Sequence, residues 1–95
     1  MLSHAQEAIA RTFAGLTDLA AGDRFSVGEW ETGTTGVPIA KGTLASFECR
    51  LERTVDHTTH IILIGEVVAT VLGDGHSLVY LDGGFSSVLR PFPAA

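Results

Sequence analysis

The sequence predicts a small, mainly β domain with one α-helix near its amino terminus. Apolar residues recur at helical spacing through the first twenty positions. Residues 44–55 alternate between apolar and polar side chains, which is the period of a half-buried strand. Residues 60–72 are apolar at both odd and even positions and rich in β-branched side chains, which is typical of a central strand covered on both faces.

Length and composition limit the classes of protein to which the chain can belong. Its 95 residues allow one small domain, 1–95. A net charge of −5, with only six scattered lysines and arginines, argues against a nucleic-acid surface. Charges interrupt the longest apolar segment, so we expect no membrane span. The first seven residues lack the basic and apolar regions of a signal peptide, and a cytoplasmic location is the default expectation.

The amino-terminal helix has a predicted start and a predicted end. Ser3 and Gln6 have the spacing of a capping box. Gly22 is placed to end the helix in a left-handed cap, after about five turns of 3.6 residues. The apolar face of this helix comprises Ala5, Ile9, Phe13, Leu16 and Ala20. Residues 23–36, rich in Gly, Thr and charge, are predicted to be a loop pinned by large apolar side chains, with Trp30 as a core anchor.

The second half of the chain predicts three consecutive strands in an antiparallel meander. Residues 44–55 and 60–72 are joined by a short connection at 56–59, and 73–75 are predicted to form a hairpin turn into a third strand at 77–81. A last short strand is expected at 85–88, before the Pro91–Pro93 tail. The alternation in 44–55 places Cys49 on the buried face and Glu48 on the polar face.

This set of elements leaves one face of the sheet without a covering layer. An antiparallel sheet whose middle strand is apolar on both faces needs two covering layers, and one helix supplies only one. We therefore expect either another copy of the chain or another polypeptide segment to cover the remaining face and to pair with the open strand edges.

Several segments, in order and spacing, resemble the flavin reductase-like proteins. They are LSHAQEAIARTFAG at 2–15, the Arg-Phe and Trp at 24–30, GVPIAKGTLASFECRLE at 36–52, THIILIGEVVA at 59–69 and LVYLDGGF at 78–85. The resemblance is to the carboxy-terminal part of the small reductase component of two-component flavin monooxygenases. It implies a partial split β-barrel, working as a homodimer with an oxygenase partner. The amino-terminal part of that domain, which in the family supplies the opening strands and most flavin-holding loops, has no counterpart in these 95 residues.

The resemblance also implies a site. The pair Thr59–His60 aligns with the family's pair before the central strand, and the distance to Gly65 favours it over Asp56–His57. In the family this histidine lies beside the nicotinamide and flavin rings, so His60 is the expected catalytic residue, and Thr59, His60 and Phe85 are the expected cofactor-binding residues. The sequence departs from the family at Thr59, where Asp is more common, and beside Phe85, where Arg or Lys is replaced by Gly84, Ser86 and Ser87.

The residues by themselves allow plainer interpretations. His60 could be a strand-end histidine bonded to a neighbouring carbonyl. The four histidines and one cysteine are not at ligand spacing, so no metal is predicted. Cys49 is interpreted as packed and Glu66 as structural.

Two functions follow from the resemblance. The first is an NADH- or NADPH-dependent reductase unit that supplies reduced FMN or FAD to a partner monooxygenase. The alternative is a non-catalytic flavin-binding or dimerisation remnant of the same fold, inactive without the missing strands. A plain antiparallel interaction module is a third possibility.

Overall fold

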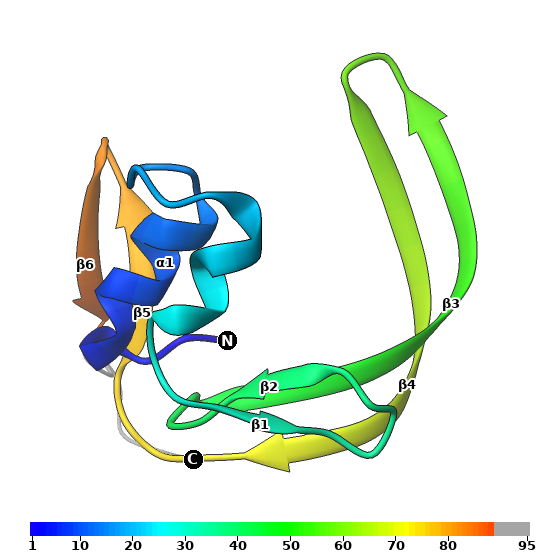
Figure 1. The fold of residues 1–95 in the computed structure, drawn as a ribbon, viewed down its shortest axis with the longest axis horizontal. Helices are drawn as coiled ribbons and strands as arrows, with labels where there is room; N and C mark the ends of the chain where they lie inside the picture. The colour runs from blue at the N-terminus through cyan, green and yellow to red at the C-terminus, as the bar shows by residue number, and fades with distance from the viewer. Residues whose placement is uncertain (89–95) are drawn as a thin grey trace.

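A computed structural model describes residues 1–88, and the predicted Pro91–Pro93 tail lies outside the described residues. Two short 3-10 helices, η1 (His4–Gln6) and η2 (Ala21–Ser26), flank the single α-helix, α1 (Glu7–Phe13). The six strands are β1 (Trp30–Thr32), β2 (Pro38–Ala40), β3 (Ala45–His57), β4 (His60–Leu72), β5 (Ser77–Leu81) and β6 (Gly84–Val88). The predicted class, mainly β with one amino-terminal α-helix, is confirmed (Figure 1). None of the described helices is long and apolar enough to cross a bilayer.

The strands form three separate antiparallel pairs, β1–β2, β3–β4 and β5–β6. The predicted three-stranded meander is therefore wrong, because β5 pairs with β6 and not with β4. Residues 73–75 are not a hairpin turn but part of the link that carries the chain from the β3–β4 pair to the β5–β6 pair (Figure 1). The Gly73 N–H donates to the Leu44 carbonyl at 2.8 Å, which ties this link to the segment preceding β3.

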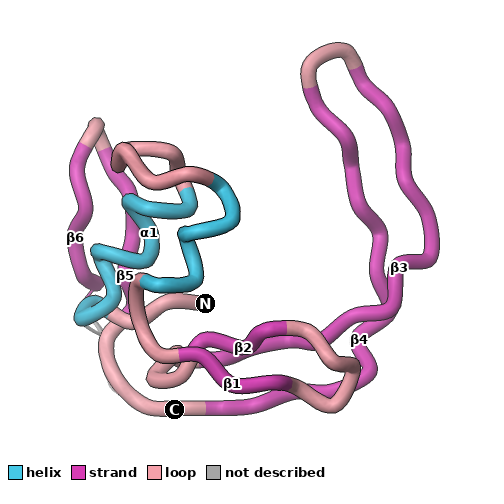
Figure 2. The backbone as a smooth tube through the Cα atoms, viewed as in Figure 1, coloured by secondary structure: helices cyan, strands magenta, loops and turns pink. Residues whose placement is uncertain are grey.

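The β3–β4 pair, which we call the arm, is a long curved hairpin that projects away from α1 and the β5–β6 pair (Figures 1 and 2). Its register places His57 opposite His60 across a two-residue turn, in which Thr58 has a φ of 51°. Register shifts occur between Glu48 and Cys49 and between Leu51 and Arg53. Such bulges bend and twist a strand, which explains the curvature of the arm.

The strand at 60–72 is predicted to be buried on both faces, and in the structure of this single chain that prediction is wrong. From residue 49 to residue 68 every residue of the arm is exposed except Val55, which is half-buried. Cys49 is exposed as well, contrary to its predicted burial. The reason is that β4 has a strand neighbour on one side only and no layer over the outer part of the arm.

The amino-terminal helix begins as predicted and ends earlier. The capping box is present, and the Ser3 N–H donates to Gln6 Oε1 at 3.0 Å. The α-helix stops at Phe13, because Gly15 adopts a φ of 78° and the Leu16 N–H donates to the Arg11 carbonyl at 2.9 Å. This arrangement is a Schellman motif with glycine in the left-handed position. The predicted end at Gly22 is therefore wrong.

Replacing Gly15 with alanine should destabilise the chain by about 1–2 kcal/mol, since a Cβ is disfavoured in the left-handed region. No atom lies within 4 Å of the Cβ position, so backbone strain is the only cause. The matched control is Gly22→Ala, where the space is equally open and φ is not positive. Urea unfolding of both variants measures the difference. If Gly22→Ala cost more than Gly15→Ala, the helix end assigned to Gly15 would be wrong.

The segment expected to be a loop contains more structure than predicted. Residues 23–36 include most of η2 and all of β1. The anchoring role of Trp30 is confirmed, since its ring lies 4.9 Å from that of Phe25 and 5.5 Å from that of Phe13, between ring centroids. Its Nε1 donates to the Val27 carbonyl at 2.8 Å. Aromatic contacts thus hold β1 and η2 against the end of α1.

Candidate functional site

The predicted pair Thr59–His60 lies at the tip of the arm. His60 is the first residue of β4 and is exposed. The Thr59 Oγ1 lies 2.9 Å from the Nδ1 of His60, and this hydrogen bond restrains the imidazole ring. Within residues 1–88 the Nε2 has no hydrogen-bond partner, so it is the ring atom available to a ligand. The plainer interpretation was a histidine hydrogen-bonded to a neighbouring carbonyl. The His60 ring is instead hydrogen-bonded to the Thr59 hydroxyl.

Phe85 lies in a different part of the molecule, on β6 beside α1. A tight turn joins β5 to β6, with Asp82 and Gly83 at φ 51° and 78°, as a two-residue hairpin turn requires. The Phe85 ring packs edge-on against Tyr80 at 5.1 Å between centroids. The guanidinium carbon of Arg11 lies 5.1 Å from the centre of the Phe85 ring, within reach of a cation–π interaction.

An apolar hollow of about 290 Å³ opens next to Phe85. Its lining consists of Ala10, Ala14, Leu16, Tyr80 and Phe85. Ala10 on α1, together with Ala14 and Leu16 just after the helix, forms one wall, and two aromatic rings from the β5–β6 hairpin form the other. The hollow is therefore mainly apolar, and the Arg11 guanidinium beside it is already paired with the Glu7 carboxylate at 3.1 Å.

The structure does not bring the predicted site residues together within one chain. Thr59 and His60 are at the far end of the arm, whereas Phe85 is on the β5–β6 hairpin on the other side of the molecule (Figure 1). Thr59 and His60 belong to the β3–β4 hairpin, and Phe85 belongs to the β5–β6 pair. A site that used all three would need a further element to join them.

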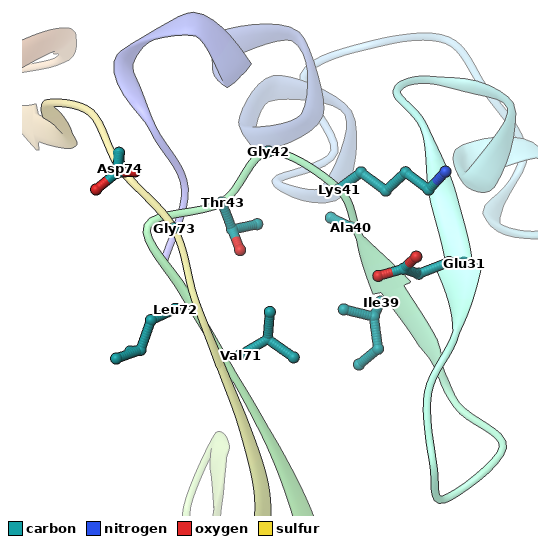
Figure 3. Close-up of a pocket in the computed structure, with 10 residues that line it drawn as sticks. All are labelled: Glu31, Ile39, Ala40, Lys41, Gly42, Thr43, Val71, Leu72, Gly73 and Asp74. Carbon is teal, nitrogen blue, oxygen red and sulfur yellow. The ribbon is translucent and has the colours of Figure 1, made fainter.

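A second hollow of about 280 Å³ lies between β2 and the end of β4 (Figure 3). The side chains of Ile39 and Val71 lie in the space between these strands, and Glu31, Lys41 and Asp74 place charges around it. Charges of both signs surround this hollow, and no single ligand chemistry is favoured by them. No group of three or more histidine, cysteine or acidic side chains among residues 1–88 is arranged to hold a metal ion.

One acidic side chain, that of Glu48, is buried although strand alternation predicts it to be exposed. It was assigned to the polar face of β3, yet it is 5% exposed. Its carboxylate accepts hydrogen bonds from the Thr35 N–H at 2.9 Å, from the Thr35 hydroxyl at 2.8 Å and from the Thr34 hydroxyl at 3.2 Å. Gly33 packs directly on the carboxylate, and a Cβ there would collide with Glu48 Oε1. We call this set of contacts the Glu48 lock, and it fastens the β1–β2 hairpin to the base of the arm.

The hydrogen bonds from Thr35, its backbone N–H first, lower the pKa of the Glu48 carboxyl below its ordinary value of 4.5. Because the folded pKa is depressed, the stabilisation is complete above the unfolded pKa and is lost as the pH falls through the folded value. Between neutral pH and a pH below 4.5, the unfolding temperature of the wild type should therefore fall more steeply than that of Glu48→Gln. The control is Glu66→Gln, an exposed carboxylate on the same arm, which should keep the wild-type slope. Equal slopes for all three proteins would contradict the lock.

Glu66 and Cys49 have no visible part in a site. The Glu66 Oε2 lies 3.7 Å from Arg50 Nη1, in an exposed cross-strand pair that agrees with its structural interpretation. Cys49 is exposed beside Gly65, where an added Cβ would lie 2.9 Å from the Cys49 Cβ.

Comparison with known proteins connects this fold to a family. The family described as "Flavin reductase like domain" matches residues 1–89. The chain belongs to the flavin reductase-like family. The resemblance drawn from the sequence is thereby confirmed.

Relatives of this flavin reductase-like chain carry related names. The reductase component of 4-hydroxyphenylacetate 3-monooxygenase from Escherichia coli is 36% identical over 96 residues, covering 100% of this chain and 56% of that protein. The FMN reductase (NADH) RutF of Klebsiella pneumoniae is 38% identical over 91 residues, covering 95% of this chain and 54% of that protein. The chain thus spans about half the length of the curated relatives it matches.

Solved structures agree on the fold. BorF, the flavin reductase component of a bacterial two-component tryptophan halogenase, superimposes with a TM-score of 0.81 at 30% identity, over 95% of this chain and 57% of BorF. The NADH:FAD oxidoreductase SgcE6 of Streptomyces globisporus gives a TM-score of 0.78 at 28% identity, over 95% of this chain and 54% of SgcE6. The arrangement of arm, α1 and β5–β6 hairpin is therefore shared with these two longer chains.

Proposed function

We propose that this chain is part of an NADH- or NADPH-dependent flavin reductase unit that supplies reduced FMN or FAD to a partner monooxygenase. The observation that carries the proposal is the family match over residues 1–89, with relatives named as NADH-dependent FMN reductase and as a monooxygenase reductase component. On this proposal residues 1–95 form a single, partial flavin reductase-like domain, which works as a homodimer.

The hollow beside Phe85 fits part of a flavin. Its volume of about 290 Å³ is near the lower end for small-molecule sites, so it would have room for a ring system and not for a whole dinucleotide. When bound, the flavin would accept a hydride from the nicotinamide. Phe85 and Tyr80 would stack against the ring.

The part assigned to His60 is to position the nicotinamide. The hydrogen bond with Thr59 Oγ1 restrains the imidazole and leaves Nε2 to face the ligand. Orientation of this kind contributes to rate without covalent chemistry by the protein. His60 and Phe85 lie in separate strand pairs, so the complete site requires a part of the assembly beyond this one chain as it is folded here.

That separation also favours the second candidate, a flavin-binding or dimerisation remnant that does not turn over alone. The two candidates differ in one measurable way. Mixed with NADH and either FMN or FAD, the reductase unit should oxidise NADH faster than a protein-free control, whereas the remnant should not. A rate equal to the control with both flavins and with both NADH and NADPH would contradict the reductase proposal for this chain. Retention of flavin without turnover would identify the remnant, and no flavin retention would leave the interaction module.

A further inference from the structure

Two histidines from opposite ends of the sequence meet beside the start of β5. His4 is the first residue of η1, which lies against β5, and His76 directly precedes β5 (Figure 1). Their ring centroids are 5.4 Å apart, with 62° between the ring planes, and both residues are exposed. The two residues are 72 positions apart in the chain, so ligand spacing in the sequence does not reveal the pair.

The backbone holds these two residues next to each other. The His4 N–H donates to the His76 carbonyl at 2.9 Å. Beside this hydrogen bond, Ser3 forms an antiparallel bridge with Ser77, and Ser3 is only 5% exposed. The backbones of His4 and His76 are therefore fixed relative to each other, and only rotation of the two side chains remains free.

The His4 ring has one nitrogen in a hydrogen bond and one nitrogen free. Its Nδ1 lies 3.4 Å from the same His76 carbonyl oxygen. A carbonyl oxygen can only accept, so Nδ1 carries the proton in this hydrogen bond and the lone pair of the neutral ring is on Nε2. Among residues 1–88 no hydrogen bond occupies that Nε2. Histidines that bind metals in proteins have this arrangement, in which one ring nitrogen donates to a carbonyl and the other faces the metal.

The separation of the two rings fits a shared metal ion. With Zn–N bonds of about 2.0–2.1 Å, two imidazoles at tetrahedral positions have ring centroids roughly 5 Å apart. The observed separation of 5.4 Å is close to this value. His57 and His60 also face each other across the arm, but in the described part of the chain their rings make no such contact, and the Nδ1 of His60 is bonded to the Thr59 hydroxyl.

We infer that His4 and His76 form a binding site for a transition-metal dication such as Zn²⁺, with one nitrogen of each ring as a ligand and water in the remaining positions. Imidazole suits Zn²⁺, Cu²⁺ and Ni²⁺, whereas Mg²⁺ prefers oxygen ligands. No third histidine, cysteine or acidic side chain among residues 1–88 joins the pair, so the site binds metal less tightly than a closed site of four protein ligands. The net charge of −5 favours a cation. The inference does not depend on the proposed reductase activity.

The experiment titrates Zn²⁺ into the protein by calorimetry, with Mg²⁺ as the control cation. Because the arm holds a second pair of histidines, the parent protein for all measurements is His57→Ala, which leaves His60 without its neighbour. We expect one Zn²⁺ per chain and no binding of Mg²⁺. In NMR spectra, Zn²⁺ should shift the ring-proton signals of His4 and His76 and leave that of His60 in place. No Zn²⁺ binding up to about 1 mM, or binding that does not move the His4 and His76 signals, would overturn the inference.

The variant His76→Phe separates metal binding from ring packing. Phenylalanine keeps an aromatic ring against His4 but has no nitrogen to bind a metal. Both His76→Phe and His4→Ala should weaken Zn²⁺ binding roughly tenfold or more, since each leaves a single imidazole. Saturating Zn²⁺ should raise the unfolding temperature of the parent by about 4 °C or more, reversibly with EDTA, and should not raise that of His76→Phe. If His76→Phe bound Zn²⁺ as tightly as the parent, the two histidines would be a packing contact only, and the inference would be wrong.

Discussion

His60→Ala should lower kcat, or raise the KM for NADH, roughly 10- to 100-fold in an active assembly, while FMN affinity stays close to that of the wild type. The reason is that the proposed part of His60 is to orient the nicotinamide, so its removal misplaces the hydride donor and leaves the flavin contacts in place. The hydrogen bond between Thr59 Oγ1 and His60 Nδ1, at 2.9 Å, holds the ring that would do this.

The arm supplies a close control for this variant. His57 lies directly opposite His60 in the register and is also exposed, but it is outside the predicted pair. His57→Ala should retain nearly full activity. Steady-state kinetics with varied NADH, together with FMN fluorescence titration, separates the two effects. If both variants behaved alike, or if His60→Ala lost flavin affinity instead, His60 would not be the nicotinamide-positioning residue.

Gly73→Ala should destabilise the chain by about 1–3 kcal/mol, because the link after β4 has no room for a side chain. A Cβ at Gly73 would collide with the backbone carbonyl oxygen of Thr43, which cannot rotate away as a side chain could. The backbone would have to shift, and the 2.8 Å hydrogen bond from the Gly73 N–H to the Leu44 carbonyl would be strained with it.

Thermal and urea unfolding measure this loss. The control is Gly84→Ala, where the nearest atom to the new Cβ is the Leu81 carbonyl oxygen at 3.9 Å, an ordinary contact. Gly84→Ala should stay within about 0.5 kcal/mol of the wild type. A Gly73→Ala protein as stable as Gly84→Ala would show that the crossing between the two strand pairs is not packed as described.

Strands were predicted well because their signals are local. Period-two alternation and β-branched runs depend on neighbouring residues in the sequence, and the predicted strands at 60–72 and 77–81 have the same bounds as β4 and β5. Their pairing was predicted less well. Gly73–Gly75 looks like a turn in sequence, but whether β4 pairs with β5 depends on how the link packs on Thr43 and Leu44, which no local pattern records.

The helix was predicted too long for a similar reason. Apolar residues continue at helical spacing past Phe13, so periodicity alone favours a helix to Ala20. Gly15 was the available signal, and its left-handed conformation ends the helix there. The apolar residues beyond it serve other contacts, such as Leu16 in the hollow beside Phe85.

The site was only partly predictable. Thr59, His60 and Phe85 came from resemblance, and their roles stay predictions. Glu48 was missed because alternation assigned it to solvent, whereas the β1–β2 hairpin folds over that face and buries it. The signal that could have found it is the Gly33-Thr34-Thr35 sequence, a small residue and two hydroxyls that together can enclose a carboxylate.

The measurement that tests the functional claim most directly is anaerobic mixing of the purified chain with FMN and NADH. Without oxygen, reduced flavin accumulates, and its loss of visible absorbance reports hydride transfer without interference from reoxidation. A reductase unit should bleach FMN faster than the protein-free control, and His60→Ala should slow the bleaching. Bleaching at the control rate with FMN and with FAD, and with NADH and with NADPH, would contradict the reductase proposal for this chain.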